Sequence, residues 1–197
     1  MKDSDENIGG FSAELREGLA TLFLWWYGNH LVVRNVLRDR KLPINDRLED
    51  MDTRDIEEAW TNRWFAKGDL QVHADCFIRE NFAWMLNDSQ ALHQRPTRLW
   101  EKLAMVILFD QVTRNALRGS ERAYAHDSIA VSIALSLMKQ HLPFQFQATI
   151  AICLRHSESI EIQQRLALYL TSTPNHRLGA ALLDIAKKHH ERIIEFG

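Results

Sequence analysis

A cluster of polar residues follows the most apolar helical stretch of the sequence, at positions where a core would be expected. Trp100 to Phe109 is strongly apolar, and Asp110, Gln111, Arg114 and Asn115 follow it. With about 100° of rotation per residue, these four stay on or just beyond the face that carries the preceding apolar side chains. A buried charge costs several kcal/mol unless it is paired, and Asp110 and Arg114 can pair because they are four positions apart.

This quartet permits two interpretations. As a structural network, Asp110 pairs with Arg114 or with a helix end, and the group fixes how the helices align. As a ligand site, the forked guanidinium of Arg114 holds an anionic group while the two amides orient it. Asp127, on the next expected helix, can join either arrangement. We expect Arg118 to serve the helix end, where a cation offsets exposed carbonyl groups.

A second polar group, His156-Ser157-Glu158, interrupts the apolar pattern of the stretch 144–170. Histidine titrates near neutral pH, so His156 and Glu158 are candidates for proton transfer against the Asp110 quartet. Two residues apart, they diverge on a regular helix, and they converge only if the chain kinks or a new helix begins there. The structural alternative is a helix start capped by Ser157, with Glu158 in its first turn.

Other reactive residues give weaker signals. The sequence has no H-x-x-x-H, H-E-x-x-H, E-x-x-H or C-x-x-C spacing, so we predict neither a metal site nor a cofactor. Cys76 and Cys153 are expected to be reduced, buried thiols, although Cys153 lies one helical turn from His156. His189 falls on an apolar stripe, where a histidine is usually a satisfied core residue.

Composition limits the class of protein. The chain has 197 residues, a net charge of −2, 46% hydrophobic and 25% charged residues, which is typical of a soluble globular protein. It shows no basic stripe for nucleic acid, no apolar run long enough for a membrane span and no signal peptide. We therefore expect a cytoplasmic protein with a mobile tail over residues 1–10 and a single domain over 11–197.

The apolar residues recur every three or four positions, which predicts an all-α fold. About eight helices joined by short loops are expected, in stacked antiparallel pairs. The stretch 87–96 reads as a loop, and 144–170 as one long helix with a kink near His156.

Motifs along most of the chain occur together in one known family. They are Leu24-Trp25-Trp26-Tyr27-Gly28; Trp64-Phe65 with Asp75, Ile78 and Phe82; Leu108-Phe109-Asp110-Gln111 with Arg114-Asn115, Arg118-Gly119, Ala123-Tyr124 and Asp127; His156-Ser157-Glu158 with Gln163; and His189 with Ile193, Ile194, Phe196 and Gly197. Through these residues the chain from about Leu22 to Gly197 resembles the domain of unknown function 924, a family of mostly bacterial proteins. The D-Q-x-x-R-N block is the most specific motif. The resemblance implies stacked helix pairs similar to tetratricopeptide arrays, and it supplies no established reaction.

The sequence also departs from the family pattern. Val112-Thr113 replaces an aromatic residue and a proline, and Cys153 replaces a proline. The family's R-F-P-H-R-N segment does not follow Gly197, so we expect a pocket that is more open than in relatives, or not functional.

The leading functional hypothesis is a pocket between helices that binds a small polar or anionic molecule. The expected ligand-binding residues are Asp110, Gln111, Arg114, Asn115, Asp127 and Gln163, and the expected acid/base pair is His156 with Glu158. The alternative is a helical-repeat adaptor for a peptide or protein partner, in which the quartet is purely structural. No catalytic signature decides whether the protein is an enzyme, and the oligomeric state is open.

Overall fold

The computed structural model describes residues 11–39, 53–171 and 177–196. The predicted all-α class is confirmed, and no strand occurs within these ranges. The tail expected at residues 1–10 lies outside them, and the tetratricopeptide-like stacking stays a prediction. The α-helices are α1 (Ala13–Tyr27), α2 (Leu31–Leu37), α3 (Thr53–Ala59), α4 (Asp69–Phe82), α5 (Ser89–His93), α6 (Leu99–Val106), α7 (Thr113–Ala116), α8 (Asp127–Leu137), α9 (Phe144–Arg155), α10 (Ile160–Thr171) and α11 (Arg177–Phe196).

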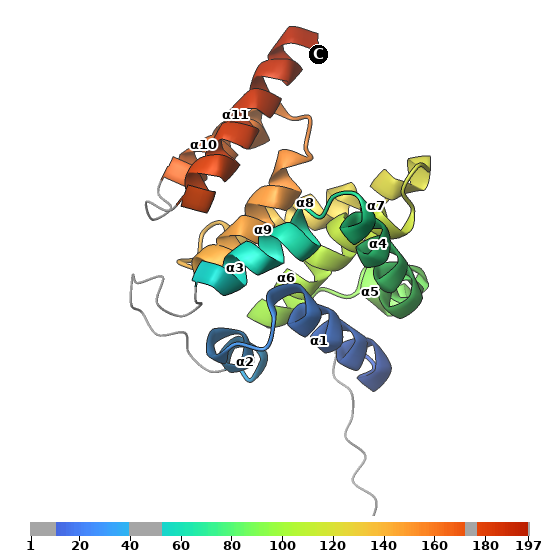
Figure 1. Cartoon of the computed structure of the whole chain (residues 1–197). Helices are drawn as coiled ribbons and strands as arrows, with labels where there is room; N and C mark the ends of the chain where they lie inside the picture. The colour runs from blue at the N-terminus through green and yellow to red at the C-terminus, as the bar shows by residue number, and fades with distance from the viewer. Residues whose placement is uncertain (1–10, 40–52, 172–176, 197) are drawn as a thin grey trace, which may run out of the picture.

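Helix α6 lies at the centre of the molecule. It packs against α1, α8 and α9, while α10 and α11 pack on each other and on α9 (Figure 1). Its residues Trp100, Leu103 and Ala104 are almost completely buried, as the apolar sequence requires. No helix in the described ranges is long and apolar enough to cross a bilayer.

A π-helical segment, Ile107–Val112 (η4), connects α6 to α7. All six of its side chains are buried, and the hydroxyl of Thr113 donates to the carbonyl of Leu108, five residues earlier, at 3.2 Å. A π turn accommodates an extra residue and so changes the rotation from one residue to the next. Because η4 packs against α1, α4, α8 and α9, Phe109 on one flank of the helix and Asp110 and Gln111 on another are all enclosed.

Helix α1 is joined to α9 by a hydrogen-bonded group inside the aromatic core. The α1 helix begins after Ser12, whose hydroxyl accepts from the backbone of Leu15, and it ends at Gly28, where φ is +82°. Thr149 of α9 accepts hydrogen bonds from Trp26 Nε1 at 3.1 Å and from the Tyr27 hydroxyl at 2.7 Å.

Two sequence expectations are corrected. The stretch 87–96 is not all loop, because Asp88 accepts from the backbone N–H groups of Gln90 and Ala91 and starts the short helix α5. The long helix expected over 144–170 is two helices, since α9 ends at Arg155 and α10 begins at Ile160. The break falls at His156, where the sequence predicted a kink.

The two cysteines differ from each other. Cys153 is buried as expected, and burial raises the pKa of its thiol well above the usual value. Cys76 is exposed, contrary to expectation, because it lies on the outer face of α4, where its thiol donates to Glu80 at 3.3 Å.

Candidate functional site

Asp110 lies at the centre of a buried polar network. Its side chain is only 2% exposed and accepts three hydrogen bonds. Gln111 Nε2 donates to Oδ2 at 2.6 Å, while Arg114 Nε and His156 Nδ1 reach Oδ1 at 2.9 and 2.7 Å. Burial favours the neutral acid, but the contacts with His156, Arg114 and Gln111 outweigh it and lower the pKa of Asp110. Asp110 is therefore an ionised carboxylate inside the protein.

Arg114 is shared between two carboxylates. Besides its bond to Asp110, its terminal nitrogen donates to Asp127 Oδ2 at 2.6 Å, and its guanidinium stacks 5.0 Å from the ring centroid of Tyr124. The sequence placed these residues in one cluster, and the structure brings them together. Two of the three nitrogens of the Arg114 guanidinium are consequently hydrogen-bonded inside the protein.

His156 reaches Asp110 because α9 ends immediately before it. Gln163 of α10 is buried, and its Nε2 donates to the carbonyl of Leu154 in the last turn of α9 at 3.0 Å and to that of Ser157, in the connection to α10, at 2.5 Å. Gln163 does not line the pocket described below, so it supports the chain reversal that carries His156.

Glu158 lies apart from the other predicted site residues. It is exposed, and within the described ranges it forms no hydrogen bond or ion pair with His156. The new helix that was expected here does begin, but its first turn is capped by Ser159, whose hydroxyl accepts from the backbone of Ile162 at 3.4 Å. Glu158 therefore precedes α10 and does not face the Asp110 network.

A second ion pair closes the other side of the site. Arg118 donates to both carboxylate oxygens of Asp75 in α4, at 2.6 and 3.0 Å, and to the amide oxygen of Asn115 at 2.7 Å. Arg118 was expected to serve the end of its own helix. It instead joins α7 to α4, because Asp75 lies on the inward face of α4 and a buried carboxylate requires a cation.

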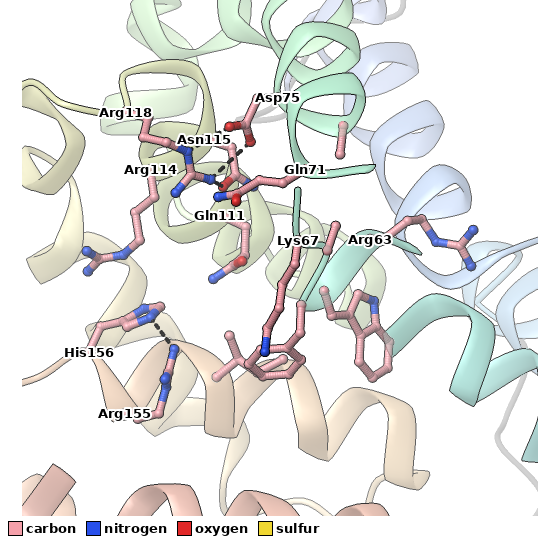
Figure 2. Close-up of a pocket in the computed structure, with 15 residues that line it drawn as sticks. Arg63, Lys67, Gln71, Asp75, Gln111, Arg114, Asn115, Arg118, Arg155 and His156 are labelled. Atoms are coloured by element: carbon pink, nitrogen blue, oxygen red, sulfur yellow. Dashed lines mark hydrogen bonds and ion pairs between the residues drawn. The ribbon is translucent and has the colours of Figure 1, made fainter. Parts of the chain in front are cut away.

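A pocket of about 340 Å³ opens between these elements, within the roughly 300–1,000 Å³ typical of small-molecule sites. Figure 2 shows His156, Gln111 and Lys67 facing one central space, while Arg63 extends away from it. The lining residues are Arg63, Trp64, Phe65, Ala66, Lys67, Gln71, Ala74, Asp75, Gln111, Arg114, Asn115, Arg118, Ile152, Arg155 and His156.

The pocket lining is strongly cationic. Five lining residues are Arg or Lys and only one, Asp75, is acidic, and that carboxylate is bound by Arg118. Within the described ranges no ion pair is formed by Lys67 or by Arg155. Arg155 instead donates to His156 Nε2 at 2.8 Å and lies 5.9 Å from the ring centroid of Phe65. Burial is the main reason why the pKa of Arg155 lies below its usual range.

Part of this lining was predicted from the sequence, and part was not. Of the predicted residues, Gln111, Arg114, Asn115 and His156 line the pocket, and Asp110 and Asp127 lie behind them. The lining cations that were not predicted as site residues are Arg63, Lys67, Arg118 and Arg155. Arg155 stands beside His156 in the sequence, and Lys67 closely follows the Trp64-Phe65 motif, so proximity to a motif was the available signal.

His189 is not the satisfied core histidine that was expected. It is half-buried, its Nε2 has no hydrogen-bond partner among the described residues, and its pKa is lowered by burial and by the neighbouring Arg155 and His156. The pKa of His126 is also lowered, through burial and Arg122.

These two histidines lead to a pH prediction. A folded-state pKa below the unfolded value of about 6.5 means that unfolding takes up protons. The stability that these two histidines contribute is therefore complete above about pH 6.5 and is lost as the pH falls below that value. NMR titration should give midpoints below 6.5 for His126 and His189, and His189→Asn should reduce the loss of stability on acidification. Midpoints at or above 6.5 would contradict this assignment.

Metal ligands do not gather at the site. Within the described part of the chain, no three His, Cys, Asp or Glu side chains are arranged to hold a metal ion. The carboxylates of the site form hydrogen-bonded pairs with arginine. The open side of the pocket offers hydrogen-bond donors. The arrangement is suited to holding an anion and to moving a proton at His156.

Fold and site together define an all-helical protein with a cationic pocket between η2 (Trp60–Trp64), α4, α7 and α9. The chain matches, over residues 25–197, the family described as bacterial protein of unknown function (DUF924), and it belongs to that family. No curated protein and no solved structure matches it. The resemblance drawn from the D-Q-x-x-R-N block is thus confirmed.

Proposed function

We propose that the protein binds a small molecule carrying an oxyanion, a phosphate or carboxylate group, in this pocket. The observation that supports this proposal is that the lining holds two cations without a carboxylate partner in the described ranges, Lys67 and Arg155, while its one acidic residue, Asp75, is already paired with Arg118. Cations gathered in a concave site raise the local concentration of anions. A pocket with this lining favours a small anion over a peptide or protein partner, and the adaptor hypothesis stays a prediction.

Lys67 and Arg155 are the proposed contacts for the anionic group. Arg114 and Arg118 are already bonded to carboxylates, so they contribute mainly positive potential. Lys67 and Arg155 have no carboxylate partner in the described ranges. A bond from either to an oxyanion is charge-assisted and roughly twice as strong as one between neutral groups. Arg114, first expected as the main ligand contact, is on this account a supporting residue.

Gln111 is the proposed polar contact for the rest of the ligand. Its amide nitrogen is held by Asp110 at 2.6 Å, which leaves the amide oxygen as an acceptor. The side chain is only 8% exposed and faces the central space in Figure 2. Held by Asp110, it presents its oxygen in a fixed orientation, so a ligand with a hydroxyl or amine beside its anionic group fits this site.

Calorimetric titration with inorganic phosphate and with citrate tests the proposal. Wild type should bind at least one of these anions at low salt. Lys67→Met and Arg155→Met should each weaken binding about tenfold or more, because each removes one bond to a charged group. Arg165→Met is the matched control, since it removes a cation from an exposed pair on α10. Absence of binding to wild type, or equal loss in the control, would overturn the proposal. Native mass spectrometry of the purified protein would identify a copurified anion.

A further inference from the structure

The orientation of the His156 ring is determined by what touches each nitrogen. Nδ1 lies 2.7 Å from Oδ1 of Asp110. An ionised carboxylate only accepts hydrogen bonds, so Nδ1 carries the hydrogen and donates it. Asp110 is itself held by Gln111 and Arg114. The basic lone pair of the neutral ring is therefore on Nε2, on the pocket side.

The lone pair of Nε2 is occupied by the neighbouring arginine. The terminal nitrogen of Arg155 donates to Nε2 at 2.8 Å, as the dashed line between these residues in Figure 2 shows. If the ring carried hydrogens on both nitrogens, two donors would face each other at this contact. Arg155 thus caps the basic nitrogen of His156 with a cation that has no carboxylate of its own in the described ranges.

An anion in the pocket would compete for that cation. A guanidinium binds an oxyanion more strongly than a neutral imidazole nitrogen, because both partners are then charged. The side chain of His156 is 20% exposed and lines the pocket, so Nε2 faces the ligand space once Arg155 turns away. Asp110 keeps the ring in place during this exchange.

We propose that His156 is a general base whose Nε2 is capped by Arg155 and released when an oxyanion-bearing substrate binds. This inference rests on the proposed anion-binding function and adds chemistry to it. The released Nε2 takes a proton from a water molecule or a substrate hydroxyl beside it. The O–H bond breaks, the N–H bond forms with the ring lone pair, and the electron pair stays on the oxygen. Asp110 then faces an imidazolium, whose charge it stabilises.

Chemical modification tests the cap. Diethyl pyrocarbonate acylates an imidazole nitrogen with a free lone pair, and peptide mass spectrometry gives the rate at His156. Arg155→Met should raise that rate about tenfold relative to wild type, since a bond from a charged donor is removed. The exposed His141 serves as internal reference, and Arg165→Met should leave the rate at His156 unchanged. An unchanged rate in folded Arg155→Met would overturn the cap.

NMR of the wild type tests the release and needs no variant. In protein labelled with ¹⁵N at histidine, added inorganic phosphate should shift the Nε2 signal of His156, assigned with His156→Gln. Phosphate binding in the calorimeter without such a shift would overturn the release and leave the proposed function standing. Absence of binding would instead overturn the proposed function and this inference with it.

Discussion

Asp110→Ala should destabilise the protein by about 3–5 kcal/mol, the cost of leaving buried charged partners uncompensated. The substitution removes the acceptor for Gln111 Nε2, Arg114 Nε and His156 Nδ1 at one time. Asp110 is 2% exposed, so water cannot easily replace the lost oxygens. In a protein of this size each kcal/mol corresponds to roughly 2–4 °C in Tm. Thermal and urea unfolding of the purified variant measure the effect.

Asp110→Asn is the matched control. It keeps the shape of the side chain and one oxygen acceptor, and the amide of Gln111 can rotate to accept from the new NH₂ group. Only the negative charge beside Arg114 is lost, and Asp127 still binds Arg114. We therefore expect the free energy of unfolding of Asp110→Asn to lie between those of wild type and Asp110→Ala. An alanine variant as stable as wild type would show that the network is not structural.

Thr149→Val should cost about 2–4 kcal/mol, although the two side chains have almost the same shape. Thr149 is 1% exposed, and its hydroxyl accepts from Trp26 Nε1 and from the Tyr27 hydroxyl. Removing that oxygen leaves two buried donors without a partner, at about 1–3 kcal/mol each. The change should appear as a lower urea midpoint with an unchanged slope.

Thr149→Ser distinguishes the hydrogen bonds from packing. Serine keeps the hydroxyl and loses only one buried methyl group, which costs about 1 kcal/mol. If the serine variant lost as much stability as the valine variant, the methyl contact and not the pair of hydrogen bonds would join α1 to α9. The pocket is lined by Ile152 and Arg155 of the same helix α9, so a Thr149 variant should also be tested for anion binding.

The two hypotheses for the quartet describe different residues of the same cluster. Asp110 and two of the three guanidinium nitrogens of Arg114 are hydrogen-bonded internally, as a structural network requires. Gln111 and His156 are held by that network and still face the pocket. A buried carboxylate that orients its neighbours is a usual way to support a binding site, because the groups that face the ligand need fixed positions. The structural role of Asp110 therefore supports a binding role for its neighbours.

Local patterns in the sequence determined the helical class, the enclosure of Asp110 and the break at His156. Apolar spacing of three and four predicts helices without reference to the rest of the chain. A carboxylate and a guanidinium four positions apart on an apolar face predict an internal pair. The polar run from His156 to Ser159 predicts an interruption for the same local reason, either a kink in one long helix or a helix start capped by Ser157.

Only the tertiary structure decided which charges are free. Arg118 pairs with Asp75, 43 positions away, while Arg155 pairs with no carboxylate in the described ranges. Both are arginines near the end of a helix, so the sequence does not distinguish them. Whether a cation is available to a ligand depends on which carboxylates the packing of α4, α7 and α9 brings within about 4 Å, and that packing is a property of the whole fold.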